Sequence, residues 1–175
     1  MGYIRGSEVT LFPPEQVLVK AEAYGTDGDY VRFAARMAYV NAGRTEYPAI
    51  VRRESVTIQM GKEIYRQSWQ MYQTFDATND HLEMLSRNEA HPETITGGSS
   101  VSHETYFAPR SDLSNSFLEW GDFVEKLERA GSAKFVFVAD FYKDKQRRAS
   151  CVVRANADLL ERLRKRKWAA PPCVE

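Results

Sequence analysis

Apolar and polar side chains alternate along much of the first half of the chain. Residues 17–24 alternate with a period of two, which places successive side chains on opposite faces of a β-strand. The clearest run is 30–41, where apolar side chains fill one face and Arg32 and Arg36 share the other. A helix would spread these two arginines among the apolar residues, so the pattern predicts a strand.

The same pattern predicts five further strands joined by short connections. Gly61 lies in a polar turn and can adopt the positive φ that a tight hairpin needs. A helix of about 115–130 is inserted before the last two strands. These five strands are 49–58, 63–75, 101–107, 134–142 and 149–155.

The strand 63–75 carries the densest aromatic group. One parity holds Tyr65, Trp69, Met71 and Phe75, and Tyr72 lies on the other. Because neither parity is purely apolar, we expect cover on both faces or a β-bulge. The group is interpreted either as core packing across a sheet or as a partner-binding face, in which Tyr72 is the exposed contact residue.

Two helices follow from apolar residues at helical spacing. In the first, about 115–130, Ser114 or Asn115 is the expected cap and Gly131 the expected stop. Its inward face is Phe117, Trp120, Val124 and Leu127.

The second helix, 157–167, is capped by Asn156 and turns Leu159, Leu160 and Leu163 inward. Between the strands, residues 76–93 are polar and irregular, with one helical turn expected at Leu82, Met84 and Leu85.

Together these elements predict a mainly β protein with an antiparallel sandwich. The chain has 175 residues and a mass of 20.0 kDa, with 43% hydrophobic and 27% charged residues, which suits one globular domain over 1–175. The sandwich core covers 15–155, the terminal helix 156–168 and a tail 169–175. A doubly wound α/β fold would need a helix between most strands, and the first half has none.

The segment 30–43 resembles the strand and Tyr-Val-Asn-x-Gly turn of immunoglobulin-like sandwich modules in uncharacterised bacterial envelope-associated proteins. The strand 102–107 fits the same picture. The resemblance implies an immunoglobulin-like β-sandwich that serves as a non-enzymatic binding or structural module through protein–protein contact. It transfers no catalytic residue. A periplasmic or membrane-anchored location would need an upstream segment, and without one the expectation is cytoplasmic.

Cys151 and Cys173 are the two cysteines of the chain. Cys151 lies in an apolar strand, where a small core residue is the simple interpretation. Cys173 lies in a proline-rich tail, where a free thiol would be exposed. A Cys151–Cys173 disulfide would remove that thiol and hold the tail in an oxidising compartment, but pairing cannot be read from sequence.

Charge is unevenly distributed along a chain whose formal net charge is +0. Neutrality and the absence of a known motif argue against a nucleic-acid partner. A basic run closes the terminal helix, either as a solvated face that complements the helix dipole or as a patch for an anionic membrane surface. Its residues are Arg162, Arg164, Lys165, Arg166, Lys167 and Trp168.

The residues with catalytic or metal-binding chemistry are scattered. Asp76, Asp80 and His81 share one polar segment, which is too little to predict a metal site, and no cofactor is expected. The alternative to a binding module is a small cytosolic α+β ligand-binding protein or enzyme. Its site would lie near His103, with Glu104 and Tyr106 as contributors from the same strand.

Overall fold

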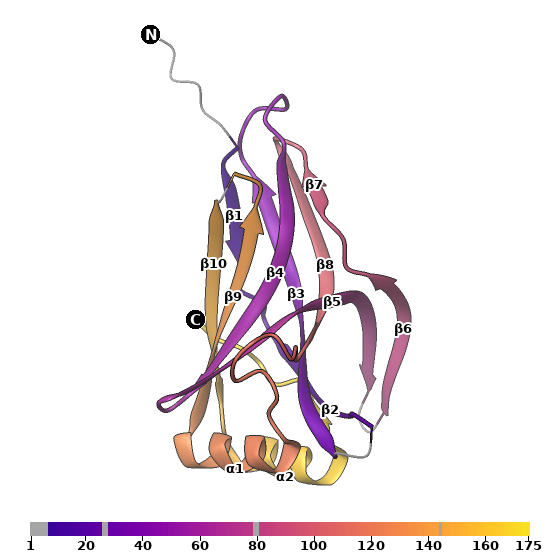
Figure 1. Ribbon diagram of the computed structural model, residues 1–175, viewed down its shortest axis with the longest axis vertical. Coiled ribbons are helices and arrows are strands. Elements are labelled where there is room, and N and C mark those ends of the chain that lie inside the picture. The colour runs from indigo at the N-terminus through magenta and orange to yellow at the C-terminus, as the bar shows by residue number, and fades with distance from the viewer. Residues whose placement is uncertain (1–6, 26–27, 79–80, 144) are drawn as a thin grey trace.

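The molecule is built on one antiparallel ladder of strands. A computed structural model describes residues 7–25, 28–78, 81–143 and 145–175, and in them the strands join into an 11-stranded sheet. The sheet curls into a half-barrel, and two helices lie side by side at one end of it (Figure 1). The mainly β, antiparallel architecture expected from the sequence is confirmed.

The strands are β1 Val9–Phe12, β2 Val17–Ala23, β3 Asp29–Asn41, β4 Ala49–Met60, β5 Glu63–Thr78, β6 His81–Glu89, β7 Glu93–Ile95, β8 Ser99–Ala108, β9 Ser132–Phe141, β10 Gln146–Arg154 and β11 Trp168–Ala169. The seven predicted strands are present as β2, β3, β4, β5, β8, β9 and β10, whereas β1, β6, β7 and β11 were not predicted. The helices are α1 Trp120–Ala130 and α2 Ala157–Arg166. Gly61 has φ 61° in the β4–β5 turn, as predicted.

Strand order runs β10-β9-β4-β5-β8-β3-β2-β11, with β1 paired to β3, β6 to β5 and β7 to β4. Within the described residues this is one continuous ladder, not the two separate packed sheets that a sandwich implies. The C-terminal tail reaches both ends of the ladder, because Pro172 bridges to Gln16 before β2 and Val174 bridges to Val152 on β10.

The concave face of the sheet holds the main apolar core. Phe33 and Phe135 pack edge to face with ring centroids 5.2 Å apart, and Phe123 of α1 contacts Phe33 in the same way. Leu127 of α1 and Leu163 of α2 are also fully buried. The helices therefore cover the open end of the curled sheet with the apolar faces that their spacing predicted.

Helix α1 begins later than expected. The prediction started it near residue 115 with Ser114 or Asn115 as the cap, but its first helical residue is Trp120 and Glu119 precedes it without a side-chain cap. The cause is tertiary: the Val31 amide donates to the Leu118 carbonyl at 2.9 Å and holds that segment extended. Phe117, predicted inward, is 43% exposed.

Helix α2 is as predicted at its start. The Asn156 side chain accepts a hydrogen bond from the Leu159 amide at 2.8 Å, and Leu159, Leu160 and Leu163 are buried. Among the described residues, neither this helix nor α1 is long and apolar enough to span a membrane.

The prediction of an irregular 76–93 segment was wrong. Strand β5 continues to Thr78, and β6 pairs with it instead of forming the helical turn expected at Leu82, Met84 and Leu85. Most side chains of β6 are exposed on both faces, so its sequence shows no alternation. This strand is defined by its backbone pairing with β5, and the two strands form an arm (Figure 1).

Of the two alternatives that the sequence left open for β5, the structure shows a β-bulge. The register with β8 shifts between Trp69 and Met71, which makes Gln70 the extra residue. Beyond it the parity is reversed, so Tyr72 lies on the concave face near Trp69, at 6.1 Å between ring centroids. Met71 lies on the convex face, and its predicted parity with Trp69 was wrong.

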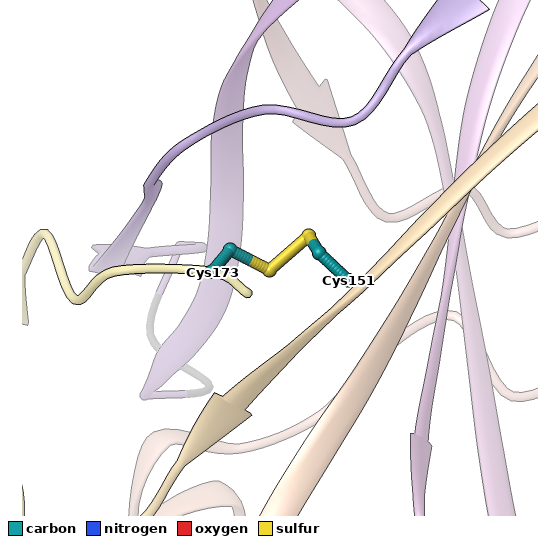
Figure 2. Close-up of a disulfide and its surroundings, with 2 residues drawn as sticks. All are labelled: Cys151 and Cys173. Carbon is teal, nitrogen blue, oxygen red and sulfur yellow. A yellow bond between two sulfur atoms is a disulfide. The ribbon is translucent and has the colours of Figure 1, made fainter. Parts of the chain in front are cut away.

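A disulfide joins Cys151 on β10 to Cys173 in the tail (Figure 2). The S–S distance is 2.06 Å and the Cα atoms are 5.3 Å apart. Both residues are buried, Cys173 included, although a tail cysteine was expected to be exposed. The bond fixes the tail against one end strand while main-chain bonds hold it to the other.

Candidate binding groove

A groove of about 900 Å³ lies on the convex face of the sheet, over β3 and β8. Its floor is made of small side chains from the two strands, which leave the space open. The strands pair with Ala38 opposite Ser102 and Val40 opposite Ser100. Such a volume is within the range of ligand-binding clefts.

Two segments from different parts of the chain form the flanks. One is the β1–β2 connection, where Pro13 and Pro14 cannot donate main-chain hydrogen bonds. The other is the end of β5, from Phe75 to Ala77, where the arm leaves β8. Leu18 and Ala170 line the groove as well, so the pinned tail contributes to it.

The flank formed by β5 is a free strand edge. Strand β5 pairs with β8 only as far as Tyr72, and from there its sole strand partner among the described residues is β6. The Phe75 amide points away from β6, because it donates to Glu104 Oε2 at 3.1 Å. The side chain of Glu104 thus occupies a place that a neighbouring strand would otherwise fill.

The charged residues of the lining are unbalanced. Of the described residues that line the groove, Glu15, Asp76 and Glu104 are acidic and Arg36 alone is basic. The Arg36 guanidinium donates to the Ser102 hydroxyl at 3.0 and 3.3 Å and has no ion-pair partner among the described residues. The groove therefore carries an excess of negative charge.

Exposed apolar side chains mark the end of the groove nearest β1. Phe12 is 46% exposed and Val40 is 36% exposed, and both line the groove. Large apolar side chains left in contact with water beside a cleft are typical of contact surfaces. The groove thus offers an apolar end and an acidic flank.

The concave face holds a second polar cluster, centred on Glu54. This residue is 0% exposed, and its carboxyl group accepts hydrogen bonds from the Tyr39 hydroxyl at 2.5 Å and the Thr105 hydroxyl at 2.9 Å. The His103 Nε2 atom lies 2.8 Å from Glu54 Oε1. A buried carboxyl group is tolerated because three polar neighbours replace its hydration.

His103 lies between two carboxyl groups. Its Nδ1 atom is 2.6 Å from Glu93 Oε2, in ion-pair range but not aligned for a hydrogen bond. Burial by itself lowers the pKa of His103, but the hydrogen bond and charge of Glu54 and the charge of Glu93 outweigh it and raise that pKa. Burial and the charge of Glu54 raise the pKa of Tyr39, which keeps its hydroxyl a donor.

A raised His103 pKa makes stability depend on pH. Because the folded-state pKa exceeds the ordinary 6.5, the stabilisation is complete below pH 6.5 and is lost as pH rises through the folded-state value. We expect the free energy of unfolding of the wild type, relative to His103→Gln, to fall as the pH rises above 6.5. Urea titrations of both proteins at each pH measure the difference. A gap that stays constant or widens with pH would contradict this assignment.

Tyr72, the predicted exposed contact residue, is half-buried. Its hydroxyl donates to the His91 carbonyl at 2.8 Å, and its ring lies 4.2 Å from the His103 ring between centroids. The bulge at Gln70 is the reason, since it turns Tyr72 toward the concave face. Tyr72 therefore supports the Glu54 cluster and does not line the groove.

The basic run of α2 is largely paired with acidic residues. Arg162 pairs with Asp158 at 3.0 Å and Lys165 with Glu161 at 2.5 Å along the helix. Arg164 pairs with Glu128 of α1, and Lys167 with Asp29 at 2.6 Å. Trp168 is half-buried in β11 and packs with Leu18, Ala34, Met71 and Tyr106. Arg166 also has an interaction partner.

The alternative site near His103 is not assembled in the structure. His103 faces the concave side, whereas Glu104 reaches the groove and Tyr106 donates to Glu22 at 2.9 Å on the convex side. His103 lines neither the groove nor a smaller cavity between Arg53 and Gln146. Of Asp76, Asp80 and His81, which were judged too little to predict a metal site, Asp80 lies outside the described residues. The described residues contain no group of three or more side chains that could hold a metal ion.

Sequence reasoning missed Glu54 and Glu93 altogether. Glu54 shares the even parity of Val56, Ile58 and Met60, so its inward position was readable from the alternation. Arg36 was assigned to the polar face of its strand correctly, but nothing in the sequence indicated a groove there. The free edge of β5 had no sequence signal, because its segment was taken as a loop.

Comparisons of the chain with models of protein families, with curated proteins and with solved structures give no match. The groove and the disulfide are therefore the basis for a functional proposal.

Proposed function

We propose that this chain is a non-enzymatic binding module whose convex groove receives a segment of a partner protein. The observation that carries the proposal is a groove of about 900 Å³ with a free strand edge along one flank. Exposed Phe12 and Val40 supply apolar contact area at one end of it. Grooves beside open strand edges are common recognition sites for extended polypeptide segments.

The proposed location is an oxidising, extracytoplasmic compartment of a bacterial cell. A disulfide between buried cysteines supports this, since such bonds persist outside the reducing cytosol. Attachment to the envelope, periplasmic or through a membrane anchor, belongs to the same proposal. The proposal also includes a relationship to immunoglobulin-like modules. The all-antiparallel pairing supports this relationship, whereas the single continuous ladder does not.

The groove is a better-supported contact site than the basic run of α2. Four basic residues of the run engage carboxylates, and Trp168 is held in the sheet. A membrane surface would have to compete with these ion pairs. A catalytic site at His103 is also less well supported, because both ring nitrogens lie beside carboxylates.

A matched pair of substitutions tests the groove. Ser100 lines the groove and Ser150 lies on β10 outside it, and both are exposed strand residues. A phage library of random nine-residue peptides is selected on the oxidised wild type, and the enriched peptides are synthesised. We expect Ser100→Trp to weaken their binding at least about tenfold by filling the groove, and Ser150→Trp to leave it unchanged.

Thermal unfolding by circular dichroism checks that both variants fold as the wild type does. The proposal is overturned if no peptide is enriched, or if enriched peptides bind the two variants equally well.

A further inference from the structure

We infer that the groove binds its partner by strand addition, in which an extended segment carrying a basic side chain pairs with the free edge of β5 at Phe75 and Ala77. The inference rests on the proposed binding function and adds the binding mode and the chemistry of the ligand.

The main chain of β5 presents unpaired groups to the groove. Along a strand, the N–H and C=O of one residue point to the same side, and successive residues alternate. Since the Phe75 amide faces Glu104, the Phe75 carbonyl and the amide and carbonyl of Ala77 face the same way. Within the described residues no strand pairs with this edge beyond Tyr72, so these groups are open to an added strand.

The Glu104 side chain accepts a hydrogen bond that the main chain of an added strand would otherwise accept. Its Oε2 atom satisfies the Phe75 amide at 3.1 Å, as the carbonyl of an added strand would. A carbonyl of the incoming segment can take over that hydrogen bond. The displaced carboxylate of Glu104 is then free to pair with a basic side chain of the segment. Replacement of this one acceptor of the Phe75 amide therefore couples main-chain pairing to side-chain recognition.

The charge of the lining favours a basic segment. Glu15 and Asp76 are exposed on opposite flanks, and no hydrogen bond or ion pair from another described residue engages either carboxylate. Arg36 is directed to Ser102 and lies opposite Glu104 in the β3–β8 register without pairing to it. A Lys or Arg side chain in the groove would therefore meet up to three carboxylates against one guanidinium.

The dimensions favour an extended segment over a helix. A strand rises about 3.3 Å per residue, so the Phe75–Ala77 edge and the floor beside it suit roughly four to six residues. A helix is about 10–12 Å wide and bonds its own main chain, so it would leave the β5 edge unpaired. Small floor residues such as Ala38 and Ser102 leave room for the alternate side chains that an added strand directs toward the sheet.

The test uses the tightest library peptide whose binding is lost in Ser100→Trp. Each of its amides is N-methylated in turn, which blocks one main-chain hydrogen bond at a time. Strand addition predicts losses of about tenfold or more at every second amide and small changes between them. Side-chain recognition alone predicts no such period, and a flat profile overturns the inference.

Charge is tested on both partners. We expect Lys or Arg to be enriched in the selected peptides, and replacement of that residue by Glu to weaken binding. In Glu104→Gln, which keeps an oxygen for the Phe75 amide, and in Asp76→Asn, we expect about two- to fivefold weaker binding. Glu83→Gln, on the exposed face of β6 outside the groove, is the matched control and should change nothing.

The two failures are distinguishable. If no Ser100→Trp-sensitive peptide exists, the proposed binding function itself fails. If such peptides exist but show no basic enrichment or no alternation, the groove binds and the strand-addition inference is overturned.

Discussion

Replacement of Glu54 by alanine is expected to lower the free energy of unfolding by about 3–5 kcal/mol, the cost of removing one partner from a buried polar cluster. The substitution leaves the hydroxyls of Tyr39 and Thr105 and the imidazole of His103 without their shared acceptor. Glu54 is fully buried on β4, so water cannot simply replace the carboxyl group. Urea unfolding at pH 6, followed by circular dichroism, measures the loss.

Glu83→Ala is the control, since Glu83 is an exposed glutamate on β6 and its removal should change stability by less than about 0.5 kcal/mol. Glu54→Gln keeps the shape and one acceptor oxygen and should lie between the wild type and Glu54→Ala. It also provides a measurable protein if the alanine variant does not fold. A loss below about 1 kcal/mol in Glu54→Ala would show that the cluster does not stabilise the fold.

Removal of the Cys151–Cys173 disulfide is expected to cost about 3 kcal/mol. The bond closes a loop with a sequence separation of 22 residues, for which the chain-entropy treatment gives a value of that size. The tail that it holds pairs with β10 at Val174 and with β2 at Ala169. Loss of the bond should therefore also expose the groove end lined by Ala170.

The measurement compares wild type with and without dithiothreitol against the double variant Cys151→Ala, Cys173→Ala. The chain has two cysteines, so the reductant acts on this one bond and should have no effect on the double variant. Equal stability of oxidised and reduced wild type would contradict the expected contribution of the disulfide.

Regular strands were predicted well because their evidence is local. The run 30–41 appears as β3 with Val31, Phe33 and Met37 buried, since a period of two decides which side chains share a face. The cap of α2 by Asn156 is equally local, because donor and acceptor are three residues apart. The start of α1 was misplaced because the competing hydrogen bond comes from Val31, far away in sequence.

The bulge at Gln70 shows that alternation in the sequence cannot assign side chains to a face of the sheet beyond a β-bulge. A mixed pattern indicated that β5 is irregular, but not at which residue the shift occurs. The extra residue is defined by pairing with β8, so Tyr72 was assigned to the wrong face. Its side chain consequently packs on His103 inside the curl instead of facing a partner.

The sequence drew attention to single residues of the candidate site but did not predict the groove that they line. In the sequence, Asp76 was considered for a metal site and Glu104 for an enzyme site. Neither interpretation placed the two residues in one groove. The proline pair that flanks the groove lies some sixty residues from the β5 edge opposite. No local pattern connects segments at that separation.

The sequence by itself determined the β character of the chain, the inward faces of its long strands and helices, and the Gly61 turn, because hydrophobic period and local hydrogen bonding act over a few residues. The tertiary structure alone decided which strand edges stay open, where the tail is pinned and which charges surround His103. These depend on pairing between distant segments, and the β5 edge is free because no other strand in the described part of the chain pairs with it.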